Sequence, residues 1–82
     1  MDFTVYILRT SSNTFYTGQT NNLEKRLAQH KSKNSKSAKY MLRFKSFKLY
    51  YQENCSTRSQ ALRREMQIKK LSHLQKEALL KL

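Results

Sequence analysis

The chain has 82 residues, and 17 Lys and Arg against 5 Asp and Glu give it a formal net charge of +12. This length supports one small core, so we expect a single domain over residues 1–82. The surplus of positive charge favours a polyanionic partner. No stretch approaches the roughly 20 apolar residues of a membrane span, and the N-terminus lacks a signal-peptide pattern, so we expect a cytoplasmic protein without membrane contact.

The first eighteen residues have the pattern of a β-hairpin. β-Branched and aromatic residues predict a strand in which Val5 and Ile7 share one face and Tyr6 lies on the other. Turn-forming residues at 11–13 are followed by renewed strand character at 15–17. The two segments therefore predict neighbouring antiparallel strands.

A helix and a basic loop are expected next. Asn21 with Glu24 three residues later resembles a capping box, and the apolar stripe that follows predicts a helix to about Lys31. Residues 31–45 are rich in Ser and Lys, which indicates a loop with a short helical turn near Tyr40.

The last part of the chain predicts one strand and two helices. Residues 47–52 form the third strand, Ser56 or Thr57 caps a helix to about Leu71, and a capping box at Ser72 begins a last helix to Leu82. The predicted order is strand, strand, helix, strand, helix, helix. The expected class is therefore α+β, a small three-stranded antiparallel sheet flanked by helices.

Glu65 does not follow the pattern of its helix. At about 100° per residue, Ala61 and Ile68 fall on the same side of the helix as Glu65, so the carboxylate points towards the core. An inward carboxylate needs a partner or a function. The alternatives are a bound metal ion or an ion pair with Arg58, Lys69 or Arg26.

Arg26 and His30 lie one helical turn apart at the border of an apolar stripe. In a structural interpretation Arg26 is a solvated cation and His30 a histidine at the helix end, favoured by the macrodipole. Tyr6 and Tyr16 would then be packing residues with exposed hydroxyls. His73 has no companion residue and is assigned no function.

Together these residues form a known pattern. The chain resembles the GIY-YIG nuclease domain in its triplets VYI (5–7) and YTG (16–18), its NLEKRL (22–27) and its LRRE (62–65). The similarity covers nearly the whole chain. The stretch at 58–71 resembles that of small stand-alone, YhbQ-like members. The resemblance implies a three-stranded antiparallel sheet with flanking helices, in agreement with the order of elements above.

The resemblance also implies a metal-dependent endonuclease. Tyr16 matches the general base and Tyr6 an assisting tyrosine, while Arg26 matches the phosphate-binding arginine. Glu65 matches the ligand of Mg²⁺ or Mn²⁺, and His30 matches a position that lines the site. Because one phosphate must touch these groups, we expect the two hydroxyls, Arg26 and Glu65 to converge on one concave patch.

The expected partner is nucleic acid, with DNA favoured over RNA. With no room for a second recognition domain, we expect selectivity for structure rather than sequence, in DNA repair or processing. Residues of the basic loop are expected to follow the phosphate backbone or line the site: Lys31, Lys33, Lys36, Lys39, Tyr40, Arg43 and Lys45.

Three positions depart from the family pattern. Val5 replaces a glycine, Thr17 replaces the usual isoleucine, and Gln19 stands where some family nucleases have a lysine that would acidify the tyrosine. A non-catalytic or weakly active nucleic-acid-binding module of the same fold is therefore an alternative. A small basic ribosome-associated or structural protein is a third, although it leaves Glu65 inward without a purpose.

Overall fold

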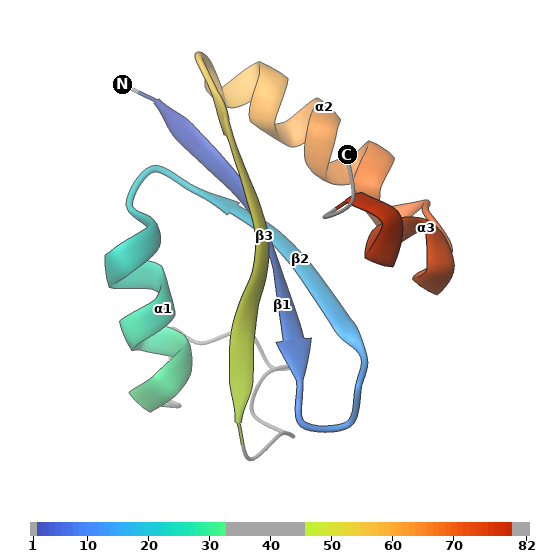
Figure 1. Ribbon diagram of the computed structural model, residues 1–82. Coiled ribbons are helices and arrows are strands. Elements are labelled where there is room, and N and C mark those ends of the chain that lie inside the picture. Colours follow the sequence, from blue (N-terminus) through green and yellow to red (C-terminus); the bar gives the residue numbers. More distant parts are fainter. Residues whose placement is uncertain (1, 33–45, 80–82) are drawn as a thin grey trace.

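The computed structural model describes residues 2–32 and 46–79 (Figure 1). Its elements, in chain order, are β1 (Phe3–Thr10), β2 (Phe15–Thr20), α1 (Leu23–Ser32), β3 (Phe47–Cys55), α2 (Arg58–Lys69) and α3 (His73–Ala78). The three strands form one antiparallel sheet in the order β2-β1-β3. This arrangement confirms the predicted α+β class, the three-stranded sheet and the order of elements.

The central strand β1 pairs with both neighbours along its length. On one side Tyr6 lies opposite Gly18 of β2, and on the other side it lies opposite Gln52 of β3. The hairpin turn places Asn13 at φ 61°, a left-handed conformation that Asn tolerates better than most residues. The predicted β-hairpin is therefore confirmed.

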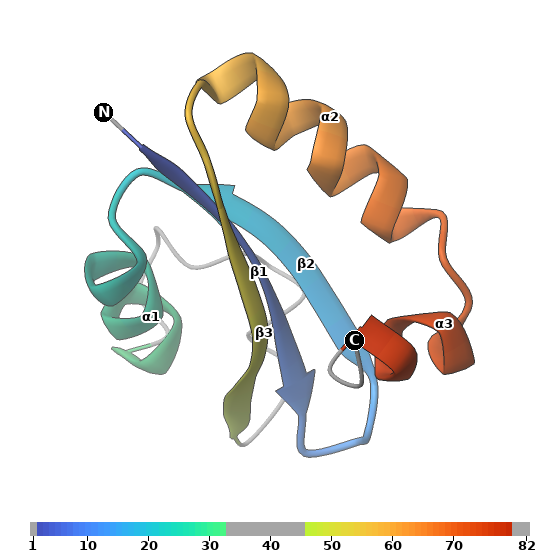
Figure 2. The ribbon, with the colours of Figure 1, turned by 45° about the horizontal axis from the view of Figure 1, so that its top comes forward.

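One face of the sheet is covered by α2. Val5 and Ile7 point to this face and pack with Ala61 and Ile68 of α2, and all four are fully buried. The short helix α3 lies on the same side (Figure 2). The prediction that the side chains of Val5 and Ile7 share one face of the sheet is confirmed.

The other face of the sheet is covered by α1. Tyr6 and Leu8 form the buried centre of this second cluster, against which Leu23, Leu27 and Tyr16 pack. Figure 2 shows α1 on one side of the sheet and α2 with α3 on the other. The period-2 alternation of β1 thus supplies both cores of the domain.

Several element bounds differ from the sequence-based predictions. Strand β3 continues to Cys55 because the chain there pairs with Phe3, a long-range partner that local patterns do not reveal. Helix α1 ends at Ser32, one residue beyond the predicted end at about Lys31. Helix α2 ends at Lys69, two residues before the predicted end at about Leu71. The loop expected at 33–45, with its turn near Tyr40, and the last residues of the chain lie outside the described residues.

The helix caps were predicted in part. Ser72 and Gln75 form the expected capping box, with the Ser72 N–H donating to Gln75 Oε1 at 2.9 Å. Thr57 accepts from the Gln60 N–H at 3.2 Å and caps α2. The first capping box was wrong by one residue, because Asn22 accepts from the Lys25 N–H at 3.1 Å in place of Asn21.

Candidate active site

Tyr6 is held over the only glycine of the chain. It is 1% exposed, and Gly18 lies opposite it on β2, so both residues face the α1 side. A methyl group at position 18 would lie 2.6 Å from the Tyr6 hydroxyl oxygen, 2.8 Å from its Cζ and 3.3 Å from Cε2 of Tyr16. Only glycine leaves room for the Tyr6 ring, which extends across β2 towards the edge of the sheet.

His30 lies against the hydroxyl end of Tyr6. It is fully buried, and its Nε2 is 3.2 Å from the Tyr6 hydroxyl oxygen. Its ring makes edge contacts with Tyr16 and Phe47, with centroids 5.6 and 6.0 Å away. The pKa of His30 is lowered to about 4, mainly by burial and in addition by the positive charge of Arg26. The imidazole is therefore neutral at pH 7.

This geometry contradicts the interpretation of His30 as a cation at the helix end. His30 does occupy the last turn of α1. The side chain, however, points under the helix into the core, where desolvation opposes a charge more strongly than the helix dipole favours it. His30 is a neutral hydrogen-bonding partner of Tyr6.

Several charged and polar groups act on the Tyr6 phenol. The pKa of Tyr6 is raised to about 12, mainly by burial, and the charges of Tyr16 and Glu65 act in the same direction. A hydrogen bond and the positive charge of Arg26 oppose this rise. The phenol therefore keeps its proton at neutral pH. The rings of Tyr6 and Tyr16 are 6.4 Å apart, centroid to centroid.

Arg26 stands between the buried tyrosine and solvent. It is half-buried on α1, and its Nη1 donates to Gln29 Oε1 at 3.0 Å. A polar pocket of about 180 Å³ opens beside it, lined by Thr20, Asn21, Asn22, Lys25, Arg26 and Gln29. The guanidinium thus borders both the phenol and an open polar space.

Glu65 approaches from the other helix. Its side chain is 17% exposed, and its Oε2 lies 2.9 Å from Nζ of Lys69, one of the ion-pair partners proposed as an alternative. Its negative charge also acts on the Tyr6 phenol. Glu65 therefore has a structural partner in Lys69 and a charge that acts on the Tyr6 phenol.

The four groups come from elements on both sides of the sheet, and their convergence on one concave patch stays a prediction. Tyr6, Tyr16 and Arg26 gather on the α1 side, whereas Glu65 belongs to α2 on the opposite side. Because β2 is an edge strand, the two sides meet at its outer edge. The candidate site therefore lies around the edge of β2.

Glu65 is the candidate ligand for a divalent metal. Within residues 2–32 and 46–79, no group of three or more His, Cys, Asp and Glu side chains is placed to hold a metal ion. Mg²⁺ is commonly held by one or two carboxylates together with waters and substrate phosphate oxygens. A single part-buried carboxylate whose charge acts on the Tyr6 phenol fits that donor set, with the remaining ligands coming from water and substrate.

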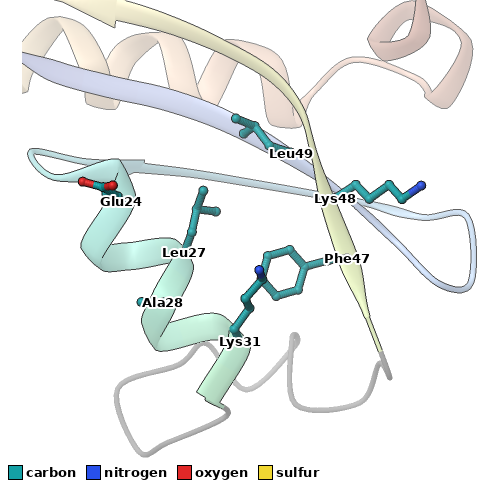
Figure 3. A pocket seen from close by; sticks show the side chains of 7 residues that line it. All are labelled: Glu24, Leu27, Ala28, Lys31, Phe47, Lys48 and Leu49. Atoms are coloured by element: carbon teal, nitrogen blue, oxygen red, sulfur yellow. The ribbon is translucent and has the colours of Figure 1, made fainter.

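A larger groove lies between α1 and β3 (Figure 3), and neither tyrosine, Arg26, His30 nor Glu65 lines it. Its volume is about 460 Å³. It is lined by Glu24, Leu27, Ala28, Lys31, Phe47, Lys48 and Leu49. Of the loop residues expected to bind nucleic acid, only Lys31 is among the described residues, and it belongs to α1. The others, Lys33, Lys36, Lys39, Tyr40, Arg43 and Lys45, lie outside the described residues.

Two features were missed by sequence reasoning. His73 has companions, since it stacks on Phe15 with centroids 4.5 Å apart and its Nε2 lies 3.0 Å from Glu77 Oε1. The spacing of His73 and Glu77, one helical turn, was the available signal. The steric role of Gly18 had no local signal, because it depends on the residue opposite on β1.

Comparison with known proteins identifies the family. The family model of the GIY-YIG catalytic domain matches residues 2–78. The chain belongs to the GIY-YIG family. This is a family of nucleases, so the GIY-YIG domain implies a nucleic-acid substrate and, in general, the use of divalent metal ions. The predicted family is thereby confirmed. No helix among the described residues is long and apolar enough to cross a membrane.

The relatives of this GIY-YIG domain are small proteins of similar length. A UPF0213 protein of Syntrophus aciditrophicus is 46% identical over 77 residues, which cover 94% of this chain and 87% of the relative. A UPF0213 protein of Staphylococcus haemolyticus is 44% identical over 72 residues, covering 88% and 85%. These proteins carry a family name that specifies no reaction.

Solved structures share the fold of this GIY-YIG domain. The solution NMR structure of a protein from E. faecalis has a TM-score of 0.68 and 35% identity, covering 99% of this chain and 84% of that one. The NMR structure of a UPF0213 protein from Bacillus halodurans has a TM-score of 0.62 and 33% identity, with the same coverage.

Proposed function

We propose that this protein is a metal-dependent endonuclease that hydrolyses phosphodiester bonds of nucleic acid. The observation that carries the proposal is the set of groups acting on the Tyr6 phenol, namely His30 by contact, Arg26 by a hydrogen bond, and Tyr16 and Glu65 by charge. The net charge of +12 suits a polyanionic substrate. We favour DNA over RNA and a structure-selective role in DNA repair or processing.

The two tyrosines differ in their suitability as a base. Tyr6 is buried, bonded to His30, and has a pKa of about 12, so it retains its proton. Tyr16 is partly exposed and can meet water. We therefore assign Tyr16 as the general base that accepts the proton of the attacking water. His30 contacts both tyrosines and holds them in place.

Arg26 and Glu65 are assigned to the phosphate. The planar guanidinium of Arg26 suits a phosphate group whose negative charge grows in the transition state. Glu65 would hold Mg²⁺ or Mn²⁺, and the bound ion would supply Lewis-acid stabilisation of the phosphoryl oxygens. As the water oxygen bonds to phosphorus and its proton passes to Tyr16, the ester P–O bond breaks. The leaving ester oxygen takes the electron pair of that bond and is protonated from solvent.

A second candidate is a nucleic-acid-binding module with little or no turnover. The Glu65–Lys69 ion pair favours it, because this pair gives the carboxylate a structural partner without metal. Gln19 favours it as well, because a lysine at this position would have helped to acidify a neighbouring phenol. The two candidates share the binding surface and differ in catalysis.

A comparison of nucleic-acid cleavage by wild type and by Glu65→Gln decides between these two candidates. The substrates are labelled duplex, flapped, branched and single-stranded DNA and RNA, each with Mg²⁺ or Mn²⁺. We expect wild type to cleave at least one of them and Glu65→Gln to lose at least about 100-fold in rate, with affinity equal or slightly higher. Unchanged cleavage by the variant would reject the role of Glu65.

The matched control is Glu77→Gln, which removes a carboxylate of α3 that pairs with His73. This variant should cleave like wild type. Mn²⁺ binding, followed by electron paramagnetic resonance of the free ion, should be lost in Glu65→Gln and kept in Glu77→Gln. A wild-type protein that binds these substrates and cleaves none of them supports the binding module.

A further inference from the structure

Two large apolar side chains of α2 face solvent. Leu62 is 42% exposed and Met66 is 60% exposed, and they lie one helical turn apart, so they form one continuous apolar patch. The core face of the same helix is already complete, since Ala61 and Ile68 are fully buried. Helix α2 therefore carries a second apolar surface that lies exposed and apart from its packing against the other described residues.

This apolar patch lies on the flank of α2 that carries Glu65. Arg64 faces β3, where its Nε donates to Glu53 Oε1 at 2.6 Å, and Glu65 is about 100° further around the helix. Leu62 and Met66 follow at about 60° and about 100° beyond Glu65, in the direction away from Arg64. The patch thus extends the candidate active site outward to solvent.

Cations stand at both ends of the patch. Arg58 precedes Leu62 by four residues and Lys70 follows Met66 by four, so the four residues form one ridge along the helix. Arg63 lies beside this ridge, and all three cations are exposed. We call the line Arg58, Leu62, Met66 and Lys70 the α2 ridge.

The charge of the ridge restricts what can cover it. A second copy of the chain would bring the same cations and a further net charge of +12 against it, which opposes association. An intact duplex offers phosphates to the cations, but its bases are stacked and present little apolar surface. An unpaired segment offers both phosphates and the apolar faces of its bases.

We propose that the α2 ridge binds unpaired nucleotides next to the scissile phosphate, with Leu62 and Met66 packed against unstacked bases and Arg58 and Lys70 on the flanking phosphates. This proposal deepens the proposed function and rests on its assignment of nucleic acid as the substrate. The ridge selects flapped or single-stranded substrates over intact duplex, and it does so by shape and stacking rather than by base sequence.

The test compares binding of Leu62→Ser/Met66→Ser with that of wild type in EDTA, where no cleavage occurs. The probes are labelled DNA of one sequence as a blunt duplex, a flapped duplex and a single strand, followed by fluorescence anisotropy. We expect wild type to bind the flap about tenfold or more tightly than the duplex. The variant should lose about tenfold on flap and single strand, and nothing on duplex.

Two controls separate the apolar contact from other effects. Leu74→Ser changes a side chain that is 76% exposed on α3, outside the ridge, and should bind like wild type. The dependence of affinity on salt should be the same for wild type and Leu62→Ser/Met66→Ser, because this dependence counts phosphate contacts. Arg58→Gln/Lys70→Gln should weaken all three probes and reduce the salt dependence by about one to two units.

A second readout follows base stacking directly. A 2-aminopurine at the flap junction should brighten when wild type binds and remain dim with the single variant Met66→Ser at saturation. If wild type and Leu62→Ser/Met66→Ser bind each of the three probes with equal affinity, the proposal is overturned. Because binding is measured without metal, a protein that lacks nuclease activity still gives a clear result.

Discussion

The ring of Tyr6 lies across Gly18, and the phenol occupies the space that a Cβ at position 18 would need, with the hydroxyl oxygen at 2.6 Å and Cζ at 2.8 Å. These atoms belong to a rigid ring whose hydroxyl also contacts His30 Nε2, at 3.2 Å. The ring therefore has little freedom to move away. One glycine on an edge strand thus fixes the position of a buried tyrosine on the central strand.

Gly18→Ala should displace the Tyr6 phenol from His30. Overpacking of this kind costs about 1–3 kcal/mol, so we expect the free energy of unfolding in urea to fall by that amount and any cleavage activity to fall with it. In a Tyr6→Leu background the same substitution should cost clearly less, because the clashing atoms are absent. An equal cost in both backgrounds would show that Tyr6 is not the cause.

His30 should make the protein less stable as the pH falls. Its folded pKa of about 4 lies below the ordinary value of 6.5, so the unfolded chain takes up the proton first. The neutral imidazole contributes fully to the free energy of unfolding above about pH 6.5. This contribution is lost as the pH falls towards 4, by up to about 3 kcal/mol. Urea unfolding between pH 7.5 and pH 4 measures this loss.

The matched comparison for this pH dependence is His30→Gln, which keeps a hydrogen-bonding group and removes the titration. The remaining titratable groups are common to both proteins. The stability of wild type should therefore fall more steeply than that of the variant between pH 6.5 and pH 4. Parallel curves would mean that His30 takes up its proton in the folded protein at its ordinary pKa.

Thr17→Val should stabilise the protein. Thr17 is 4% exposed, and its Oγ1 is buried without a hydrogen-bond partner among the described residues. Replacing this hydroxyl by a methyl group of similar size removes an unsatisfied polar atom, so we expect a gain of about 1 kcal/mol in the free energy of unfolding. The family's usual isoleucine at this position agrees with an apolar site.

Thr10→Val is the control for this substitution. Thr10 is 6% exposed, but its Oγ1 lies 2.7 Å from Thr14 Oγ1 and accepts from the Thr14 and Ser12 N–H groups at 3.2 and 3.3 Å. The same change there should destabilise by about 1–2 kcal/mol. If Thr17→Val destabilises as much as Thr10→Val, then Oγ1 of Thr17 has a partner in solution.

The sequence by itself determined the features that depend on neighbouring residues. The alternation of Val5, Tyr6 and Ile7 predicted which face each takes, because side chains of a strand alternate whatever covers them. The Ser72 and Gln75 capping box was readable, because both of its hydrogen bonds close within one turn. The spacing of the family motifs identified the GIY-YIG domain, which the family model and the relatives confirm.

The tertiary structure alone decided the features that depend on distant residues. Strand β3 reaches Cys55 because of its pairing with Phe3. His30 is neutral because the sheet buries it, although its place at a helix end favours a cation. Glu65 pointed inward in the sequence pattern, yet its place on the opposite side of the sheet from Tyr16 follows from how α2 packs. Burial and electrostatic environment are properties of the assembled layers, which local periodicity does not contain.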